Sequence, residues 1–451
     1  MDPVLKTGEQ QCSVGSNPTP SAMHQQHGVA EIEQTQIDGR WKGVPAGASL
    51  RVADVGAQGW NVARGDLPLP VTTLRRGALE HNIATMAEYC AREGVLFAPH
   101  GKTTMSPQLF HRQLDAGAWG ITAATPTQVV TMRMSGVRRV LMANQLTEPS
   151  FIRWIAGELA DDPGFEFLCL VDSAAGVELL ESTLGAMDSS VVLPVLLEAG
   201  VQQGRSGART VEEALRVARL VAEAPHLELA GVETYEGLVT TGGAPADLEA
   251  VDAHFAAVRG IVRRLAAERL LTTAAPLVTA GGSTYFDRVV AALRDWDEVG
   301  LPIRLVLRSG CYVSHDLAEY HALSPLDGRR PAGEPLRLQN ALEAWGTVLS
   351  RPEPDLAIVG AGKRDVPYDV SLPTVVRVHR RDGTRGGLPG AEVFRVMDQH
   401  AFIRLAPEQH LAPGDVVVFG LSHPCTAFDK LRLVPIIDDD ATVVEAVLTY
   451  F

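Results

Sequence analysis

The sequence lacks the long apolar run that a membrane-spanning helix requires. A bilayer span needs about 20 consecutive, mainly apolar residues, and no stretch of the 451 residues approaches this without charges. The first residues, Met1-Asp2-Pro3, are not followed by a basic region and then an apolar one, which is the pattern of a secretory signal. We therefore expect neither membrane insertion nor secretion.

Basic residues and paired cysteines are also scarce. The chain has 40 Lys and Arg against 54 Asp and Glu, a net charge of −14, which disfavours a non-specific nucleic-acid surface. The five cysteines are odd in number and include no C-x-x-C pair: Cys12, Cys90, Cys169, Cys311 and Cys425. This pattern predicts no disulfide framework and a reducing, cytoplasmic environment.

The length predicts more than one domain, because single hydrophobic cores stop growing at about 250 to 300 residues. Residues 1–45 are rich in Gln, Ser, Gly and Thr without an apolar period, which predicts a mobile extension. We assign residues 46–320 to an α/β domain and residues 321–451 to a second domain that is rich in β-structure.

Apolar runs alternate with helix-like stretches through the first domain. The helix signal is clearest over residues 247–270, where apolar side chains recur at spacings of three and four. Eight such alternations match a (β/α)8 barrel of the TIM type. A doubly wound sheet is the alternative, because periodicity alone does not exclude it. The predicted strands are Val95–Ala98, Trp119–Ala123, Arg139–Ala143, Glu166–Val171, Val191–Leu197, Glu228–Glu233, Pro276–Ala280 and Ile303–Leu307.

The alternation stops beyond about residue 309. Short β-rich segments follow, such as 356–359, 375–378, 402–405 and 416–419, and Gly and Pro residues separate them. This pattern predicts a C-terminal antiparallel β domain.

One lysine lies at the end of the first predicted barrel strand. Lys102 follows the apolar run Val95–Ala98, and strand ends in alternating α/β chains face the binding side of the fold. A partly desolvated ammonium group has a lowered pKa, which leaves the amine available as a nucleophile. The alternative is an ordinary solvated loop lysine.

A glycine-rich loop follows the seventh predicted strand. In Gly281-Gly282-Ser283-Thr284, backbone N–H groups and hydroxyls precede a predicted helix, and barrels often bind phosphate after the seventh or eighth strand. The alternative is a strand-to-helix turn with a Ser or Thr cap.

His423 and Cys425 form a candidate metal-ligand pair near the C-terminus. If the segment is extended, the two side chains point to the same side, and imidazole with thiolate suits zinc. Further ligands would be water, substrate or a distant residue such as His400. The alternative is a turn with a buried cysteine.

Two longer stretches carry a family resemblance. Residues 98–107, APHGKTTMSP, and residues 113–122, QLDAGAWGIT, resemble the D-serine dehydratase and D-threonine aldolase family. These are fold-type III enzymes that use pyridoxal 5′-phosphate (PLP). The resemblance runs from about Asp66 to Phe451, and residues 308–313, RSGCYV, resemble the family's strand-end motif.

The resemblance implies roles for the candidate residues. Lys102 would form the internal aldimine with PLP and then take the α-proton of the substrate. The PLP phosphate would bind at Gly281, Gly282, Ser283 and Thr284. The cofactor ring would lie near Arg205 and Tyr235. His423 and Cys425 would hold a divalent metal ion, for which their imidazole and thiolate groups suggest zinc.

The expected activity is that of a D-serine dehydratase-like lyase. A β-hydroxy D-amino acid would lose water and yield a 2-oxo acid and ammonia. The aldolase branch of the family more typically has His and Asp as metal ligands, so Cys425 favours elimination over retro-aldol cleavage. The alternatives are D-threonine aldolase activity and a non-catalytic role in PLP homeostasis. The resemblance also implies a homodimer.

Overall fold

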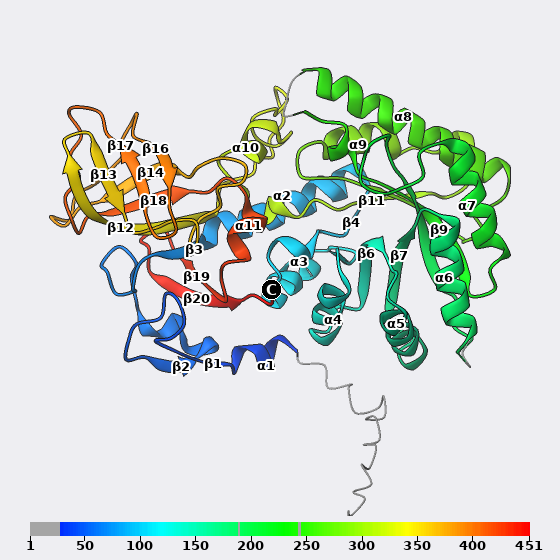
Figure 1. The fold of residues 1–451 in the computed structure, drawn as a ribbon, viewed down its shortest axis with the longest axis horizontal. Coiled ribbons are helices and arrows are strands. Elements are labelled where there is room, and N and C mark those ends of the chain that lie inside the picture. The colour runs from blue at the N-terminus through cyan, green and yellow to red at the C-terminus, as the bar shows by residue number, and fades with distance from the viewer. Residues whose placement is uncertain (1–27, 188–189, 242–244) are drawn as a thin grey trace, which may run out of the picture.

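The computed structural model describes residues 28–187, 190–241 and 245–451. Figure 1 shows a barrel of strands and helices on the right and a β domain on the left. Among the described residues, no helix combines the length and the apolar character needed to cross a bilayer.

Eight parallel strands form the barrel predicted from the sequence. Their order is β4-β11-β10-β9-β8-β7-β6-β5. A parallel bridge between His100, which follows β4, and Thr122, which lies in β5, joins the two ends of this strand order, so the ring closes. This closure distinguishes the barrel from a doubly wound sheet. The strands are β4 Leu96–Phe97, β5 Ile121–Ala123, β6 Arg139–Gln145, β7 Glu166–Val171, β8 Leu193–Ala199, β9 Leu227–Thr234, β10 Leu277–Ala280 and β11 Arg304–Leu307.

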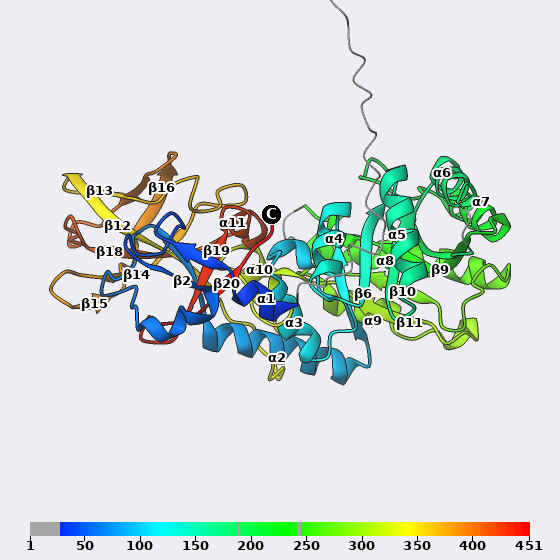
Figure 2. The same ribbon diagram turned by 90° about the horizontal axis from the view of Figure 1, so that it is seen from below.

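Helices cover the outside of the barrel (Figures 1 and 2). Several begin where a side chain caps the first turn: Thr210, for example, accepts a hydrogen bond of 3.1 Å from the backbone N–H of Glu213. The apolar stripe predicted over residues 247–270 is buried in α8. The helices are α2 Arg76–Glu93, α3 Pro107–Asp115, α4 Pro126–Met134, α5 Pro149–Asp161, α6 Ala174–Gly185, α7 Val211–Glu223, α8 Pro245–Ala267 and α9 Phe286–Leu293.

The C-terminal domain is built from antiparallel strands, as predicted. Its strands are β12 Leu342–Glu353, β13 Leu356–Val359, β14 Thr374–His379, β15 Arg385–Gly386, β16 Glu392–Val396, β17 Ala401–Arg404, β18 Val416–Gly420, β19 Leu433–Ile437 and β20 Val443–Leu448. β3 (Val71–Arg75) precedes the barrel in the chain but pairs antiparallel with β12 and parallel with β19. The fully buried Trp345 fixes this contact, because its indole N–H donates to Thr73 Oγ1 at 3.0 Å.

The predicted N-terminal extension, residues 1–45, falls partly outside the described residues, which begin at residue 28. Residues 28–45 differ from the prediction of a mobile segment: they include α1 (Val29–Glu33) and β1 (Gln36–Asp38), and β1 pairs with β2 (Ser49–Arg51). Ile32, Ile37 and Val44 are buried in one cluster with residues of β19 and β20. A few well-placed apolar residues are therefore enough to dock this polar segment.

Two short helices lie between the barrel and the β domain: α10 (Glu319–Leu323), after β11, and α11 (Pro424–Phe428), after β18. Both views place them there (Figures 1 and 2). They reach the barrel at the carboxyl ends of its strands, where barrel sites lie. Short 3-10 segments complete the fold: η2 Val52–Asp54, η3 Gly56–Gln58, η4 Gly101–Thr103, η5 Glu236–Leu238, η6 Asp297–Val299 and η7 Cys311–Val313.

Candidate active site

A cavity of about 330 Å³ opens at the carboxyl ends of the barrel strands. This volume is within the usual range of small-molecule sites, about 300 to 1,000 Å³. Apart from His400, the possible further metal ligand, the residues predicted for the site all line the cavity: Lys102, Arg205, Tyr235, Gly281, Gly282, Ser283, Thr284, His423 and Cys425. Five segments that are far apart in the sequence thus meet in one place.

Lys102 is exposed to this cavity from the turn η4, whereas its neighbours Gly101 and Thr103 are buried. A Cβ atom on Gly101 would lie 2.5 Å from Met132 Cε and 2.8 Å from Ile121 Cγ2. Only glycine allows the turn to pack this tightly on the barrel. The packing therefore projects the Lys102 side chain into the cavity.

A buried ion pair lies at the cavity wall. Arg308, only 3% exposed, pairs with Glu233 and donates to Thr279 Oγ1 at 2.9 Å and to Thr234 O at 3.0 Å. Burial raises the pKa of Glu233 to about 7, although the Arg308 charge opposes the shift. Neither residue was among the predicted site residues. Arg308 directly follows β11 and begins the RSGCYV segment, whose resemblance to the family's strand-end motif was its sequence signal.

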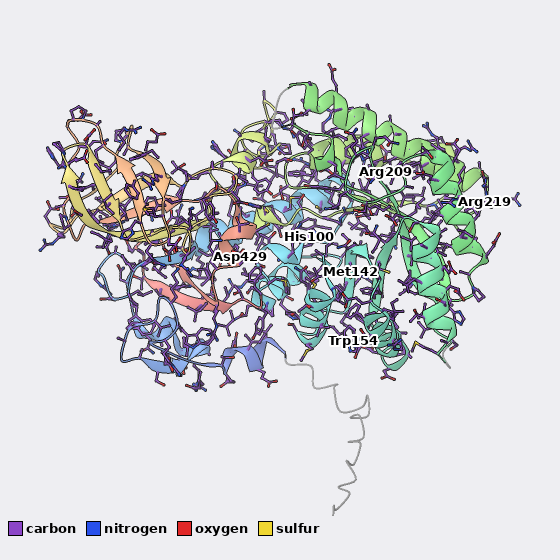
Figure 3. The ribbon with its side chains drawn as sticks, viewed as in Figure 1. His100, Met142, Trp154, Arg209, Arg219 and Asp429 are labelled. Atoms are coloured by element: carbon purple, nitrogen blue, oxygen red, sulfur yellow. The ribbon has the colours of Figure 1, made fainter. Side chains whose placement is uncertain are left out.

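His100 is a further cavity residue without a predicted role, and it lies where the barrel meets α11 (Figure 3). Burial lowers the pKa of His100 well below its ordinary value, and the charges of Lys102 and Arg308 act in the same direction. The imidazole is therefore neutral near pH 7. Its Nδ1 atom is buried without a hydrogen-bond partner, which leaves a polar group available to a ligand.

The glycine-rich loop after β10 lies against the segment after β11. Gly281 has a φ of +121°, which side chains rarely tolerate. The N–H of Gly282 donates to Glu236 Oε1 at 2.6 Å, so this amide is already used within the protein. The hydroxyl of Ser283 accepts from the N–H of Cys311 at 3.2 Å. The side chains of Ser283 and Thr284 line the cavity.

Arg205 and Tyr235 form one side of the cavity. The guanidinium carbon of Arg205 lies 5.6 Å from the centre of the Tyr235 ring, a cation–π contact. Burial raises the pKa of Tyr235 to about 12, so its phenol stays protonated at neutral pH. The pair offers one cationic group and one hydroxyl donor to a ligand.

The candidate metal ligands come from the start of α11. The sequence places the two side chains on the same side if the segment is extended; this condition is not met, because Cys425 is inside the helix and His423 precedes it. Both still line the cavity. His423 Nδ1 lies 2.6 Å from Asp369 Oδ2, and Thr426 donates to Asp369 Oδ1 at 2.8 Å. A hydrogen bond with Cys425 raises the pKa of His423 to about 9.

Asp369 was not predicted for the site. Carboxylates that orient a metal-binding histidine through its second nitrogen are common in metal sites, and Asp369 has this position. His400, the distant candidate ligand, is not there: it is exposed beside β17, accepts from the N–H of Met397 through its carbonyl oxygen, and is not part of the cavity lining.

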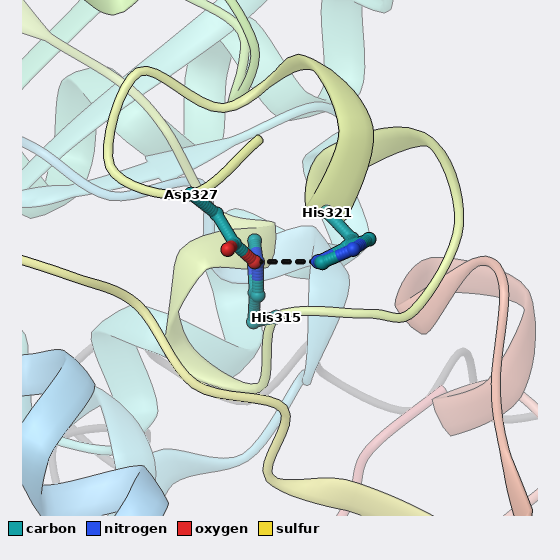
Figure 4. A group of neighbouring side chains, drawn as sticks. All are labelled: His315, His321 and Asp327. Carbon is teal, nitrogen blue, oxygen red and sulfur yellow. Dashed lines mark hydrogen bonds and ion pairs between the residues drawn. The ribbon is translucent and has the colours of Figure 1, made fainter. Parts of the chain in front are cut away.

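A second group of ligand-type side chains lies beside α10 (Figure 4). Asp327 Oδ2 is 2.9 Å from His315 Nε2 and 2.7 Å from His321 Nδ1, and Arg337 lies 3.4 Å from the other carboxylate oxygen. Burial opposes ionisation of Asp327, but the bonds from the histidines lower its pKa below the ordinary value. This group holds the segment between β11 and β12 together.

Comparisons with known proteins agree with the fold. The family model for the alanine racemase N-terminal domain matches residues 74–303, slightly more than half of the chain, and a "putative serine dehydratase domain" model matches residues 341–437. The fold and the cavity therefore define a barrel enzyme of the alanine racemase type. The chain belongs to the D-serine dehydratase and D-threonine aldolase family of fold-type III PLP enzymes.

Individual relatives are distant. The chain is 27% identical to a 3-hydroxy-D-aspartate aldolase of Paracoccus denitrificans, over 77% of this chain and 85% of that protein. It is 25% identical to a D-threonine aldolase of Arthrobacter sp., over 77% and 82%. The crystal structure of D-threonine aldolase from Filomicrobium marinum has a TM-score of 0.70 at 23% identity and covers 87% of this chain and 97% of that one. The D-threo-3-hydroxyaspartate dehydratase of Delftia sp. HT23 has a TM-score of 0.68 at 21% identity, over 86% and 99%.

Proposed function

We propose that this protein is a PLP-dependent lyase that acts on a β-hydroxy D-amino acid with the help of a divalent metal ion. One observation carries the proposal: Lys102, the Gly281–Thr284 loop and the pair His423 and Cys425 line the same cavity of about 330 Å³. Each feature alone has an ordinary structural explanation. A PLP lyase uses all three.

The cavity residues fit PLP. Lys102 offers an amine to the cofactor's aldehyde carbon, and Ser283 and Thr284 offer hydroxyls to its phosphate. Arg205 and Tyr235 would contact the ring from the side. Bound PLP supplies an electron sink for the negative charge that develops at the substrate's α-carbon.

The protein's own groups would move the protons. The Lys102 amine would be the group that takes the α-proton of the substrate. The neutral His100 beside it adds no competing positive charge. His423 and Cys425 would hold the metal, a Lewis acid for the β-hydroxyl of the substrate, and Asp369 would orient His423.

Dehydration is our first candidate reaction because the ligand pair contains a thiolate. One solved structure of the same fold is the metal-free form of a D-threo-3-hydroxyaspartate dehydratase in which a cysteine is replaced by alanine. It is 20% identical to this chain, with a TM-score of 0.68. In a dehydration the β-hydroxyl leaves, and the resulting enamine hydrolyses to a 2-oxo acid and ammonia.

Retro-aldol cleavage is the second candidate, because the curated relatives at 25% and 27% identity are named as aldolases. Here the β-hydroxyl loses its proton and the bond between Cα and Cβ breaks. The products are glycine and an aldehyde. Both reactions would use PLP on Lys102 and the metal, but dehydration breaks the Cα–H and Cβ–O bonds, whereas retro-aldol cleavage breaks the O–H and Cα–Cβ bonds.

Product analysis tests the proposal. Purified, PLP-loaded protein is incubated with the D- and L-forms of serine, threonine and 3-hydroxyaspartate, and ammonia, 2-oxo acid, aldehyde and glycine are measured. We expect turnover of a D-form, with ammonia and 2-oxo acid in equal amounts for dehydration. The control Lys102→Ala should lose turnover and the yellow absorbance of lysine-bound PLP. Undiminished yellow colour in this variant would refute the assignment of Lys102.

A further inference from the structure

Cys311 lies against the proposed metal-ligand pair, although no sequence pattern marked it as a ligand. Its Sγ atom is 3.5 Å from Cys425 Sγ, and the hydroxyl oxygen of Thr103 is 3.4 Å from Cys425 Sγ and 3.7 Å from Cys311 Sγ. The Cys311 side chain lines the same cavity as His423. Two sulfurs and an imidazole thus meet at one corner of the cavity.

The backbone around Cys311 is built for this contact. A Cβ atom on the preceding Gly310 would lie 2.5 Å from His100 O and 3.0 Å from Thr103 Oγ1, so only glycine allows η7 to approach η4 this closely. The N–H of Cys311 is fixed by the hydroxyl of Ser283. On the other side, α11 packs against η4. Three separate segments therefore hold the two sulfurs together.

We propose that Cys311 is a third protein ligand of the metal ion that His423 and Cys425 would hold. This inference rests on the metal site of the proposed function and makes it more specific. The site becomes a His-Cys-Cys centre, with Asp369 as the partner that orients the histidine.

The separation of the sulfurs agrees with shared coordination. Two thiolates on one tetrahedral zinc, with Zn–S bonds of about 2.3 Å, lie about 3.8 Å apart. The observed 3.5 Å between Cys311 and Cys425 is close to this value. A disulfide would need the sulfurs at about 2.05 Å. A divalent cation would also remove the repulsion that two adjacent thiolates otherwise experience.

A third protein ligand affects which metal ion the site prefers and how many coordination positions remain open for substrate. Two thiolates and an imidazole favour zinc over manganese and magnesium, which prefer oxygen ligands. Catalytic zinc sites typically have three protein ligands and keep the fourth position for water or substrate. With Cys311 included, the centre reaches that number without His400 or any other distant residue. The open position is then left for the substrate's β-hydroxyl.

Zinc X-ray absorption on the PLP-loaded protein tests this directly, because it counts the sulfur neighbours of the metal. We expect two sulfurs at about 2.3 Å in the unmodified protein and one in Cys311→Ser. Zinc affinity, measured by chelator competition, should fall in Cys311→Ser by more than the roughly 10- to 100-fold that loss of an outer hydrogen-bond partner costs. PLP absorbance should be unchanged.

Cys90→Ser is the matched control, because Cys90 and Cys311 are both free thiols that are 4% exposed, and Cys90 lies on α2 outside the cavity lining. This variant should keep two sulfurs on zinc. A single sulfur in the unmodified protein, or a disulfide between Cys311 and Cys425 in zinc-loaded protein, would overturn the inference. The unmodified protein gives this answer even if Cys311→Ser does not fold.

The variants also separate this inference from the proposed function. If Cys425→Ser loses zinc while Cys311→Ser keeps its affinity and sulfur count, the metal site stands and only the role of Cys311 fails. If Cys425→Ser and His423→Ala both bind zinc unchanged, the metal site of the proposed function is itself wrong.

Discussion

Two groups of ligand-type side chains lie on either side of α10, and they differ in what their atoms already bind. Tyr320 of this helix lines the cavity that contains Cys311, His423 and Cys425. The next residue, His321, bonds instead to Asp327, together with His315. Both groups contain histidine within reach of a carboxylate, but only the first opens onto the cavity.

The comparison shows that the hydrogen-bond partners of a side chain, more than its residue type, indicate whether it is available to bind a metal. In the second group, two imidazoles donate to one carboxylate oxygen and Arg337 approaches the other, so charge and hydrogen bonds are satisfied internally. In the first group the donors include two thiols, which are weak hydrogen-bond partners and strong metal ligands. We therefore propose metal binding for the first group and a contribution to fold stability for the second.

The largest expected difference between the groups is in metal content. His423→Ala should lose bound zinc and reduce turnover by about 100- to 1,000-fold, the scale of losing a main electrostatic contribution to catalysis. His321→Ala should keep both zinc and turnover. Metal analysis and a product assay on the two purified variants check this. Equal zinc loss in both variants would remove the distinction between the groups.

A smaller loss of zinc affinity in the first group is expected when Asp369 is changed. Asp369→Asn keeps the size of the side chain but removes the charge that orients His423, so zinc affinity should fall by about 10- to 100-fold. The measurement is chelator competition, with Asp327→Asn as the matched change in the other group. If Asp369→Asn binds zinc as tightly as the unmodified protein, Asp369 does not support the metal site.

In the second group the expected effect is on stability. Asp327→Asn weakens two bonds between histidine and a carboxylate and should reduce the free energy of unfolding by about 1 to 3 kcal/mol. Urea denaturation measures this loss, and the zinc content should be unchanged. A fall in zinc content with unchanged stability would reverse our assignment of the two groups.

A pH dependence of stability is expected at the start of α10. Asp316 accepts backbone N–H bonds from Ala318, Tyr320 and His321, yet burial raises its pKa from 3.8 to about 6. A raised pKa means that the folded state binds the proton more tightly, so this stabilisation is lost as the pH rises from about 4 through about 6.

The size of this effect is at most about 3 kcal/mol, from the linkage between pKa and stability. Asp316→Asn cannot titrate, so its unfolding free energy should fall less than that of the unmodified protein between pH 4 and pH 7. The change with pH is the readout, because the substitution also shifts stability at every pH. Parallel curves for the two proteins would contradict the raised pKa.

The barrel was predictable because its strands are short apolar runs between turns. β7 has the predicted bounds, Glu166–Val171, and β10 and β11 each begin one residue later than predicted. β3 was not predicted to join the C-terminal sheet, since its partners β12 and β19 are hundreds of residues away along the chain. Apolar patterns show that a strand forms and do not show what it pairs with.

For the site, too, local sequence patterns identify individual residues but not which distant residues become their neighbours. Lys102, the glycine-rich loop, His423 and Cys425 each stand in a recognisable local pattern, and the structure brings them together. Cys311 and Cys425 are 114 residues apart, so no spacing links them. Asp369 and Arg308 were missed for a similar reason, because their partners His423 and Glu233 are distant in sequence and become neighbours only through the fold.

We propose that one cavity combines lysine-bound PLP with a metal that acts on the β-hydroxyl. The most direct measurement is turnover of the reactive D-amino acid by PLP-loaded protein before zinc removal, after removal and after zinc is returned, with PLP absorbance followed throughout. We expect absorbance to persist, product formation to stop without zinc, and zinc to restore it. Full turnover by zinc-free protein that retains PLP would contradict this account.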